Sequence, residues 1–117
     1  YTVTPCRIVD TRDSSPLVDG VPIDIVFRDN CGIPPTALAV AANLTVTQPS
    51  LPGYLSVHPP GIASPGTSVV HFATGKTRAA MTIVKLSDGG GGDARFLATV
   101  PTGGTVHVIV DVSGYFE

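Results

Sequence analysis

The chain has 117 residues, a net charge of −2 and only 14% charged side chains, and its seven basic residues are scattered along the sequence. This length suits one domain with its own hydrophobic core, so we expect a single domain over residues 1–117. Because the basic residues are scattered, they form no positively charged surface for nucleic acid, and we expect no nucleic-acid binding. No apolar run is long enough to span a bilayer, so we expect no membrane insertion.

The residue types favour strands and turns over helices. There are sixteen Val and thirteen Thr but one Glu and two Lys, together with 13 Gly and 11 Pro. Strand-like runs separated by turn residues recur at the spacing typical of an all-β antiparallel sandwich, jelly-roll-like or Greek key, with about eight strands. The expected runs are Val3–Val9, Val21–Arg28, Ala37–Gln48, Gly53–His58, Thr67–Thr74, Thr77–Leu86, Asp93–Val100 and Thr105–Ser113.

The first run contains one of the two cysteines. Cys6 and Cys31 have no metal-ligand spacing, so the pair most simply predicts one disulfide, and the alternative is two free buried thiols. A disulfide would tie the first strand to the loop after the second and would place the protein outside the cytosol, extracellular or at the cell surface. Ahead of it, the segment Tyr1–Thr4 is expected to be extended and able to pair with the sheet edge of a neighbouring molecule.

The end of the first run carries a charged pair. If the strand alternation continues to Arg12, then Asp10 and Arg12 are neighbours on one face. Such a pair most often forms a structural ion pair that fixes a turn. The alternative is that Arg12 contacts a ligand, since a guanidinium beside a carboxylate can hold a sugar hydroxyl or a substrate carboxylate.

The later runs differ in how clearly they alternate. The second run alternates cleanly, with four apolar residues expected to face the core, and the last run does the same. The third and sixth runs have no strongly polar face, which indicates either a covered central strand or a subunit interface. The core-facing residues expected in the second run are Val21, Ile23, Ile25 and Phe27, opposite Asp24 and Arg28.

No catalytic signature is present, and we expect no enzyme, cofactor or metal site. The three histidines lie on different expected strands without metal-ligand spacing, the loop aspartates match no calcium-binding loop, and the only Glu is Glu117. Asp88 and the Gly run 89–92 predict a hairpin tip rather than a phosphate cradle, because no helix follows. Tyr54, at a strand start, either covers one end of the core or contacts a carbohydrate ligand.

The sequence contains five motifs: Cys6–Arg12 with Thr4-Pro5 before it, Cys31–Pro34, Asn43–Thr47, Gly53–Leu55 and Val108–Phe116. Together they resemble a poorly characterised extracellular domain that recurs in bacterial secreted and cell-surface proteins, often in tandem. The resemblance implies a β-rich, non-catalytic surface module with its two cysteines paired, and it transfers no catalytic residue. Because the chain begins at Tyr1 rather than Met, we expect either a mature subunit or an excised repeat.

These observations favour a structural or interaction module of a bacterial cell surface or extracellular filament. We expect copies of the chain itself, or neighbouring surface domains, as its partners. Low charge, apolar strand faces and an extended N-terminus motivate this hypothesis. The alternative is a lectin-like carbohydrate-binding module in which loops together with Arg12 and Tyr54 contact glycans; the absence of Trp argues against it.

Overall fold

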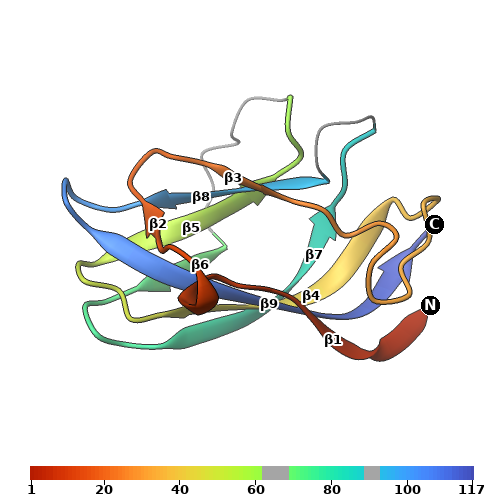
Figure 1. Cartoon of the computed structure of the whole chain (residues 1–117), viewed down its shortest axis with the longest axis horizontal. Helices are drawn as coiled ribbons and strands as arrows, with labels where there is room; N and C mark the ends of the chain where they lie inside the picture. Colours follow the sequence, from red (N-terminus) through yellow and green to blue (C-terminus); the bar gives the residue numbers. More distant parts are fainter. Residues whose placement is uncertain (62–68, 89–92) are drawn as a thin grey trace.

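A computed structural model of the chain describes residues 1–61, 69–88 and 93–117. Within these residues the chain is all-β, with two antiparallel sheets packed face to face as a β-sandwich (Figure 1). The elements are β1 (Thr2–Asp10), the 3-10 helix η1 (Thr11–Asp13), β2 (Leu17–Val18), β3 (Ile23–Ile25), β4 (Ala39–Thr47), β5 (Gly53–His58), β6 (Val70–Phe72), β7 (Arg78–Lys85), β8 (Ala94–Thr99) and β9 (Thr105–Phe116).

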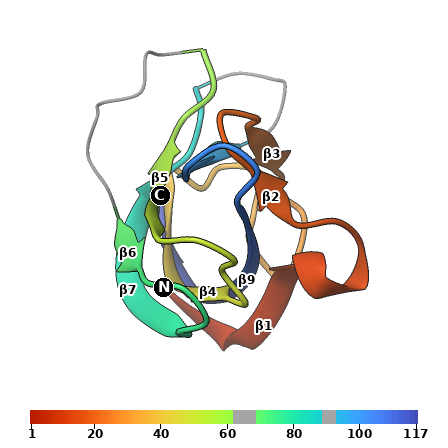
Figure 2. The same cartoon turned by 90° about the vertical axis from the view of Figure 1, so that its left-hand side faces the viewer.

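The two sheets have different strand orders. The first sheet runs β1-β9-β4-β7, with β2 also pairing with β9, and the second runs β3-β8-β5-β6. Viewed end-on, β1, β2 and β3 lie on one side of the sandwich and β6 and β7 lie on the opposite side (Figure 2). Within the described residues the sandwich therefore has two open seams between its sheets, one between β1 and β3 and the other beside β7.

The core follows from the alternation of the central strands. In β4 every second side chain, from Val40 to Val46, is fully buried, while the intervening side chains are half-buried. In β9 the valines at 106, 108, 110 and 112 are fully buried in the same way. The third predicted run, left open between a covered central strand and an interface, is thus a central strand between β9 and β7.

The second predicted run is wrong in its length and in one of its core residues. Only Ile23–Ile25 pairs as a strand, and Val21 is 54% exposed. Pro22 has no N–H to donate, and beyond Val26 the backbone N–H groups of Phe27 and Arg28 donate to the Asp93 carboxylate instead of to a strand. Arg28 was also expected on the solvent face, but it is half-buried.

Other boundaries differ less. The predicted strand Val3–Val9 ends at Asp10, so Arg12 lies in η1 and not on a strand face. The last strand continues beyond Ser113 to Phe116, and the predicted run Thr67–Thr74 is a strand only over β6. Thr67 and Ser68, like the predicted hairpin tip at residues 89–92, lie outside the described residues.

The N-terminal segment is not free but pairs within its own chain, and its pairing with a neighbouring molecule stays a prediction. Tyr1 and Tyr115 exchange two backbone hydrogen bonds, and their rings stack with centroids 5.1 Å apart. Gly114 makes this contact possible, because a Cβ there would lie 2.7 Å from the carbonyl oxygen of Tyr1. The segment ahead of Cys6 therefore lies on β9 of its own chain.

Candidate functional site

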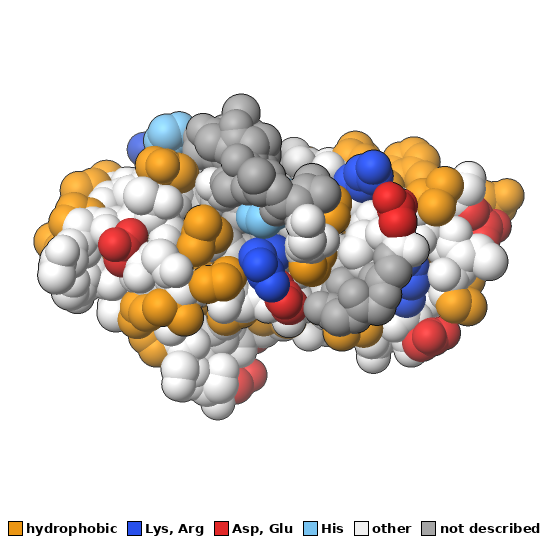
Figure 3. Space-filling view, turned by 90° about the horizontal axis from the view of Figure 1, so that it is seen from above, with side chains coloured by type: hydrophobic (Ala, Val, Ile, Leu, Met, Phe, Trp, Pro, Cys, Tyr) orange, Lys and Arg blue, Asp and Glu red, His pale blue; other side chains and the backbone are white. Residues whose placement is uncertain are grey.

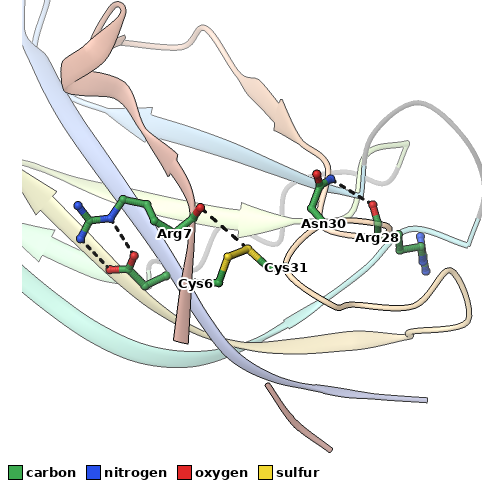
Figure 4. Close-up of a disulfide and its surroundings, with 6 residues drawn as sticks. Cys6, Arg7, Arg28, Asn30 and Cys31 are labelled. Carbon is green, nitrogen blue, oxygen red and sulfur yellow. Dashed lines mark hydrogen bonds and ion pairs between the residues drawn. A yellow bond between two sulfur atoms is a disulfide. The ribbon is translucent and has the colours of Figure 1, made fainter. Parts of the chain in front are cut away.

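The disulfide predicted from the sequence is present. Cys6 in β1 is bonded to Cys31 in the loop after β3, with a Cα–Cα distance of 5.8 Å (Figure 4). The bond joins the edge strand of the first sheet to the segment that leaves the edge strand of the second. It therefore fastens the β1–β3 seam covalently, which restricts how far the two sheets can separate there.

Asp10 and Arg12 lie together, through a turn rather than a shared strand face. The backbone N–H and Nε of Arg12 donate to Asp10 Oδ1 at 3.1 and 2.9 Å, and Nη2 donates to Oδ2 at 2.7 Å. The hydrogen bond from the Arg12 side chain lowers the pKa of Asp10 to about 2. This bidentate pair engages the Nε and Nη2 groups of the Arg12 guanidinium.

Tyr54 lies in the other sheet. It is half-buried on β5, and its ring centroid is 5.7 Å from that of His71. No contact between Tyr54 and Arg12 is present in the described part of the chain: Arg12 lies in η1, after β1 of the first sheet, and Tyr54 lies in β5 of the second. The structure thus does not bring the two predicted ligand contacts together, and a glycan-binding role for either stays a prediction.

Ion pairs occupy the outer surface near the disulfide. Arg7 donates to Asp111 at 2.9 Å, and Arg95 donates to Asp24 at 2.8 Å. The hydrogen bond from Arg95 lowers the pKa of Asp24. On the face seen in Figure 3, charged side chains of opposite sign lie beside one another and hydrophobic side chains are dispersed among polar ones.

The edge strand β7 presents a different surface. Met81 and Ile83 are 64% and 59% exposed on its outer face, and Phe116 of β9 is 49% exposed. The register places Ile83 beside Ala41 of β4, and Ala39 lies between Lys85 and Phe116. Because the two alanines are small, they leave the larger side chains on either side exposed. We call the outer-face residues Ala39, Ala41, Met81, Ile83 and Phe116 the β7 patch.

The backbone edge of β7 is also unoccupied by any described strand. β7 pairs with β4 through eight consecutive residue pairs without a bulge, and β4 is its only partner strand in the described residues. The Leu86 N–H donates to the Leu38 carbonyl, so by alternation the backbone groups of Met81 and Ile83 point away from β4. A regular, unpaired edge of this kind is a template for another strand.

A shallow groove runs beside this edge. Its volume is about 230 Å³, and it separates β7 from the end of β5 and the segment before β6. Its lining is mainly apolar. The residues that line it are Val57, His58, Pro59, Val69, Thr82, Ile83, Val84 and Lys85.

Comparison with known proteins adds no family. No protein-family model, curated protein or solved structure matches the chain. The described residues hold no group of three His, Cys, Asp or Glu side chains placed to bind a metal ion. They also contain no helix with the length and apolarity that a membrane span requires.

Proposed function

We propose that this chain is a non-catalytic structural or interaction module of the extracellular space or cell surface, which associates with copies of itself or with neighbouring domains through the β7 patch. The observation that carries the proposal is the exposure of Met81 and Ile83 on an edge strand whose outer backbone edge pairs with no described strand. Exposed apolar side chains clustered beside an open strand edge are typical of association surfaces.

The disulfide supports the proposed location in the extracellular space or at the cell surface. Cys6–Cys31 is a cross-link of the kind that persists in oxidising environments, and both cysteines of the chain are used in it. The pairing also agrees with what the resemblance to bacterial surface domains implies. An extracellular module that carries its own covalent cross-link is suited to contacts that must endure outside the cell.

The experiment is a comparison of association in solution. The purified protein is examined by sedimentation velocity over a wide concentration range and by negative-stain electron microscopy. We expect concentration-dependent assemblies for the native chain, and at least a tenfold weaker association for Ile83→Gln, since one buried aliphatic side chain contributes roughly 1.5 to 3 kcal/mol.

The matched control is Leu97→Gln. Leu97 is a half-buried aliphatic residue of β8 in the second sheet, away from the β7 patch. We expect this variant to associate like the native chain. A native chain that stays monomeric at every concentration contradicts the self-association, and equal weakening by both substitutions contradicts the assignment to the β7 patch.

A further inference from the structure

The basic side chains of this molecule divide into two groups. Four arginines form ion pairs: Arg7, Arg12, Arg28 and Arg95. The other three basic residues, Lys76, Arg78 and Lys85, are all exposed and lie in β7 or in the turn before it. None of these three forms an ion pair within the described residues, which include every charged residue of the chain. All uncompensated lysine and arginine charge is therefore collected at one edge.

The carboxylates show a complementary distribution. Asp13, Asp19 and Asp29 form no ion pair in the described residues, and all three are exposed. Asp13 ends η1, Asp19 follows β2 and Asp29 lies in the loop after β3; the strands β1, β2 and β3 lie on the side of the sandwich opposite β7 (Figure 2). Two further carboxylates without an ion pair, Asp88 and Glu117, lie elsewhere. We call Asp13, Asp19 and Asp29 the acidic row.

The cations at the two ends of β7 disfavour a symmetric dimer in which β7 pairs with β7 of a second copy. If β7 paired antiparallel with β7 of a second copy, Arg78 and Lys85 of the two chains would be brought near each other at both ends of the ladder, on opposite faces of the sheet, and like charges repel. A symmetric dimer that extends the sheet through β7 is therefore disfavoured. The apolar centre of this edge with its cationic ends fits an acidic partner surface instead.

The acidic side is itself protected against strand addition. Pro5 has no N–H to donate, and the pairing of β1 with β9 shifts register between Thr2 and Cys6 and again between Arg7 and Val9. These features interrupt the regular backbone edge that a further strand would need. Contacts with another molecule on this side must therefore be made by side chains. Among these side chains, the carboxylates of the acidic row are the charges that form no ion pair in the described residues.

We infer that a second copy of this chain binds with its acidic row against the cationic β7 edge of the first. This inference rests on the proposed self-association and names its geometry. The two surfaces lie on opposite sides of one molecule, so the contact is head-to-tail and leaves one of each surface free at the ends. Repetition of the contact gives an open chain of molecules rather than a closed pair.

Charge reversal with complementation tests the geometry. One variant, Arg78→Glu/Lys85→Glu, reverses the two cations of β7; the other, Asp13→Lys/Asp29→Asn, removes two of the three carboxylates of the acidic row and keeps a residue suited to the positive φ of position 29. We expect each variant alone to associate at least tenfold more weakly than the native chain. An equimolar mixture of the two should recover association, because the first variant keeps an intact acidic row and the second keeps an intact basic edge, and these two surfaces can bind each other.

Salt dependence and a control complete the experiment. Association of the native chain should weaken at least tenfold between low salt and about 0.5 M salt, where the Debye length falls to roughly 4 Å. Asp88→Asn, which removes an exposed carboxylate outside the acidic row, should not weaken association. Thermal unfolding of each variant establishes that it is folded.

The outcomes separate this inference from the proposed function. A native chain that remains monomeric overturns both. Association that is unaffected by salt and charge reversal, a mixture that recovers nothing, or a closed two-fold dimer leaves self-association standing and overturns the head-to-tail geometry.

Discussion

The two open seams of this sandwich are built in opposite ways. The seam between β1 and β3 has a disulfide, a proline in the edge strand, two register shifts and ion pairs on its outer surface. The seam beside β7 has an uninterrupted ladder to β4, exposed apolar side chains and cations without an ion pair in the described residues. In this sandwich the stabilising restraints lie at the seam where addition of a further strand is blocked. The regular backbone edge of β7, by contrast, is left unpaired in the described residues.

The largest expected effect concerns the anchor at the end of β3. Asp93 is 6% exposed; it accepts the N–H groups of Phe27 and Arg28 and pairs with the Arg28 guanidinium at 2.7 Å. Asp93→Ala leaves these donors without their acceptor and should lower the free energy of unfolding by roughly 3 to 5 kcal/mol. Urea denaturation at pH 7 measures it.

The exposed neighbour Asp88 supplies the control for that prediction. Asp88→Ala removes the same type of side chain from the same connection and should change the free energy of unfolding by less than about 0.5 kcal/mol. Similar losses for the two variants would show that the anchor does not set the stability of the restrained side.

Removing the disulfide should have the next largest effect. Cys6→Ser/Cys31→Ser opens a loop of 25 residues, and the chain-entropy model gives a loss of at most about 3.5 kcal/mol. Hydrogen exchange should quicken first in β1 and in the loop that holds Cys31. If amides of β7 and β4 lose as much protection as those of β1, the contrast between the seams is wrong.

The docking of the N-terminus tests a smaller contact on the restrained side. Gly114→Val places side-chain atoms where the carbonyl of Tyr1 lies, so residues 1 and 2 should leave β9 while Cys6 keeps the rest of β1 in place. We expect a loss of about 1 kcal/mol in the free energy of unfolding and fast exchange of the Tyr115 amide, which donates to the Tyr1 carbonyl in the native chain. Ser113→Val, one position earlier, should retain that protection.

The smallest effect is a dependence on pH. The folded-state pKa of Asp10 is about 2, below its ordinary value of 3.8, so its ion pair contributes stability that is complete above about pH 4 and is lost as the pH falls towards 2. Asp10→Asn should therefore be less stable than the native chain at pH 7, and the difference should shrink between pH 4 and pH 2. Urea midpoints at several pH values measure it.

Asp13→Asn is the control in that series, since Asp13 forms no ion pair within the described residues. Its difference from the native chain should stay nearly constant over the same pH interval. A constant difference for Asp10→Asn as well would contradict the role of its pair with Arg12.

The sequence predicted the class of fold and the disulfide because both depend on local signals. Alternating valines in β9 and the lone cysteine pair needed no knowledge of strand order. The anchor between Arg28 and Asp93 was missed because its partners are 65 positions apart and belong to different expected strands. β2 was missed because two residues show no periodicity.

The candidate site at β7 could not be predicted from the sequence, because it depends on strand order. Neither face of the run at Ala79–Leu86 is strongly polar, and that pattern suits a covered strand as well as an exposed one. Whether Met81 and Ile83 meet solvent depends on β7 being the last strand of its sheet, and strand order is set by contacts distant in sequence. The cationic character of the edge emerges only when the ion pairs of the other arginines are known.

The position of β9 bears on how the molecule is made. The strand nearest the C-terminus of this chain lies between β1 and β4 in the first sheet and also pairs with β2. During synthesis, β1, β2 and β4 cannot complete their pairing until β9, their common partner, has been made. Such long-range pairing slows folding. The nascent domain should thus remain open until residues 105–116 are available, and only then can Cys6 be held against Cys31 by a completed sheet.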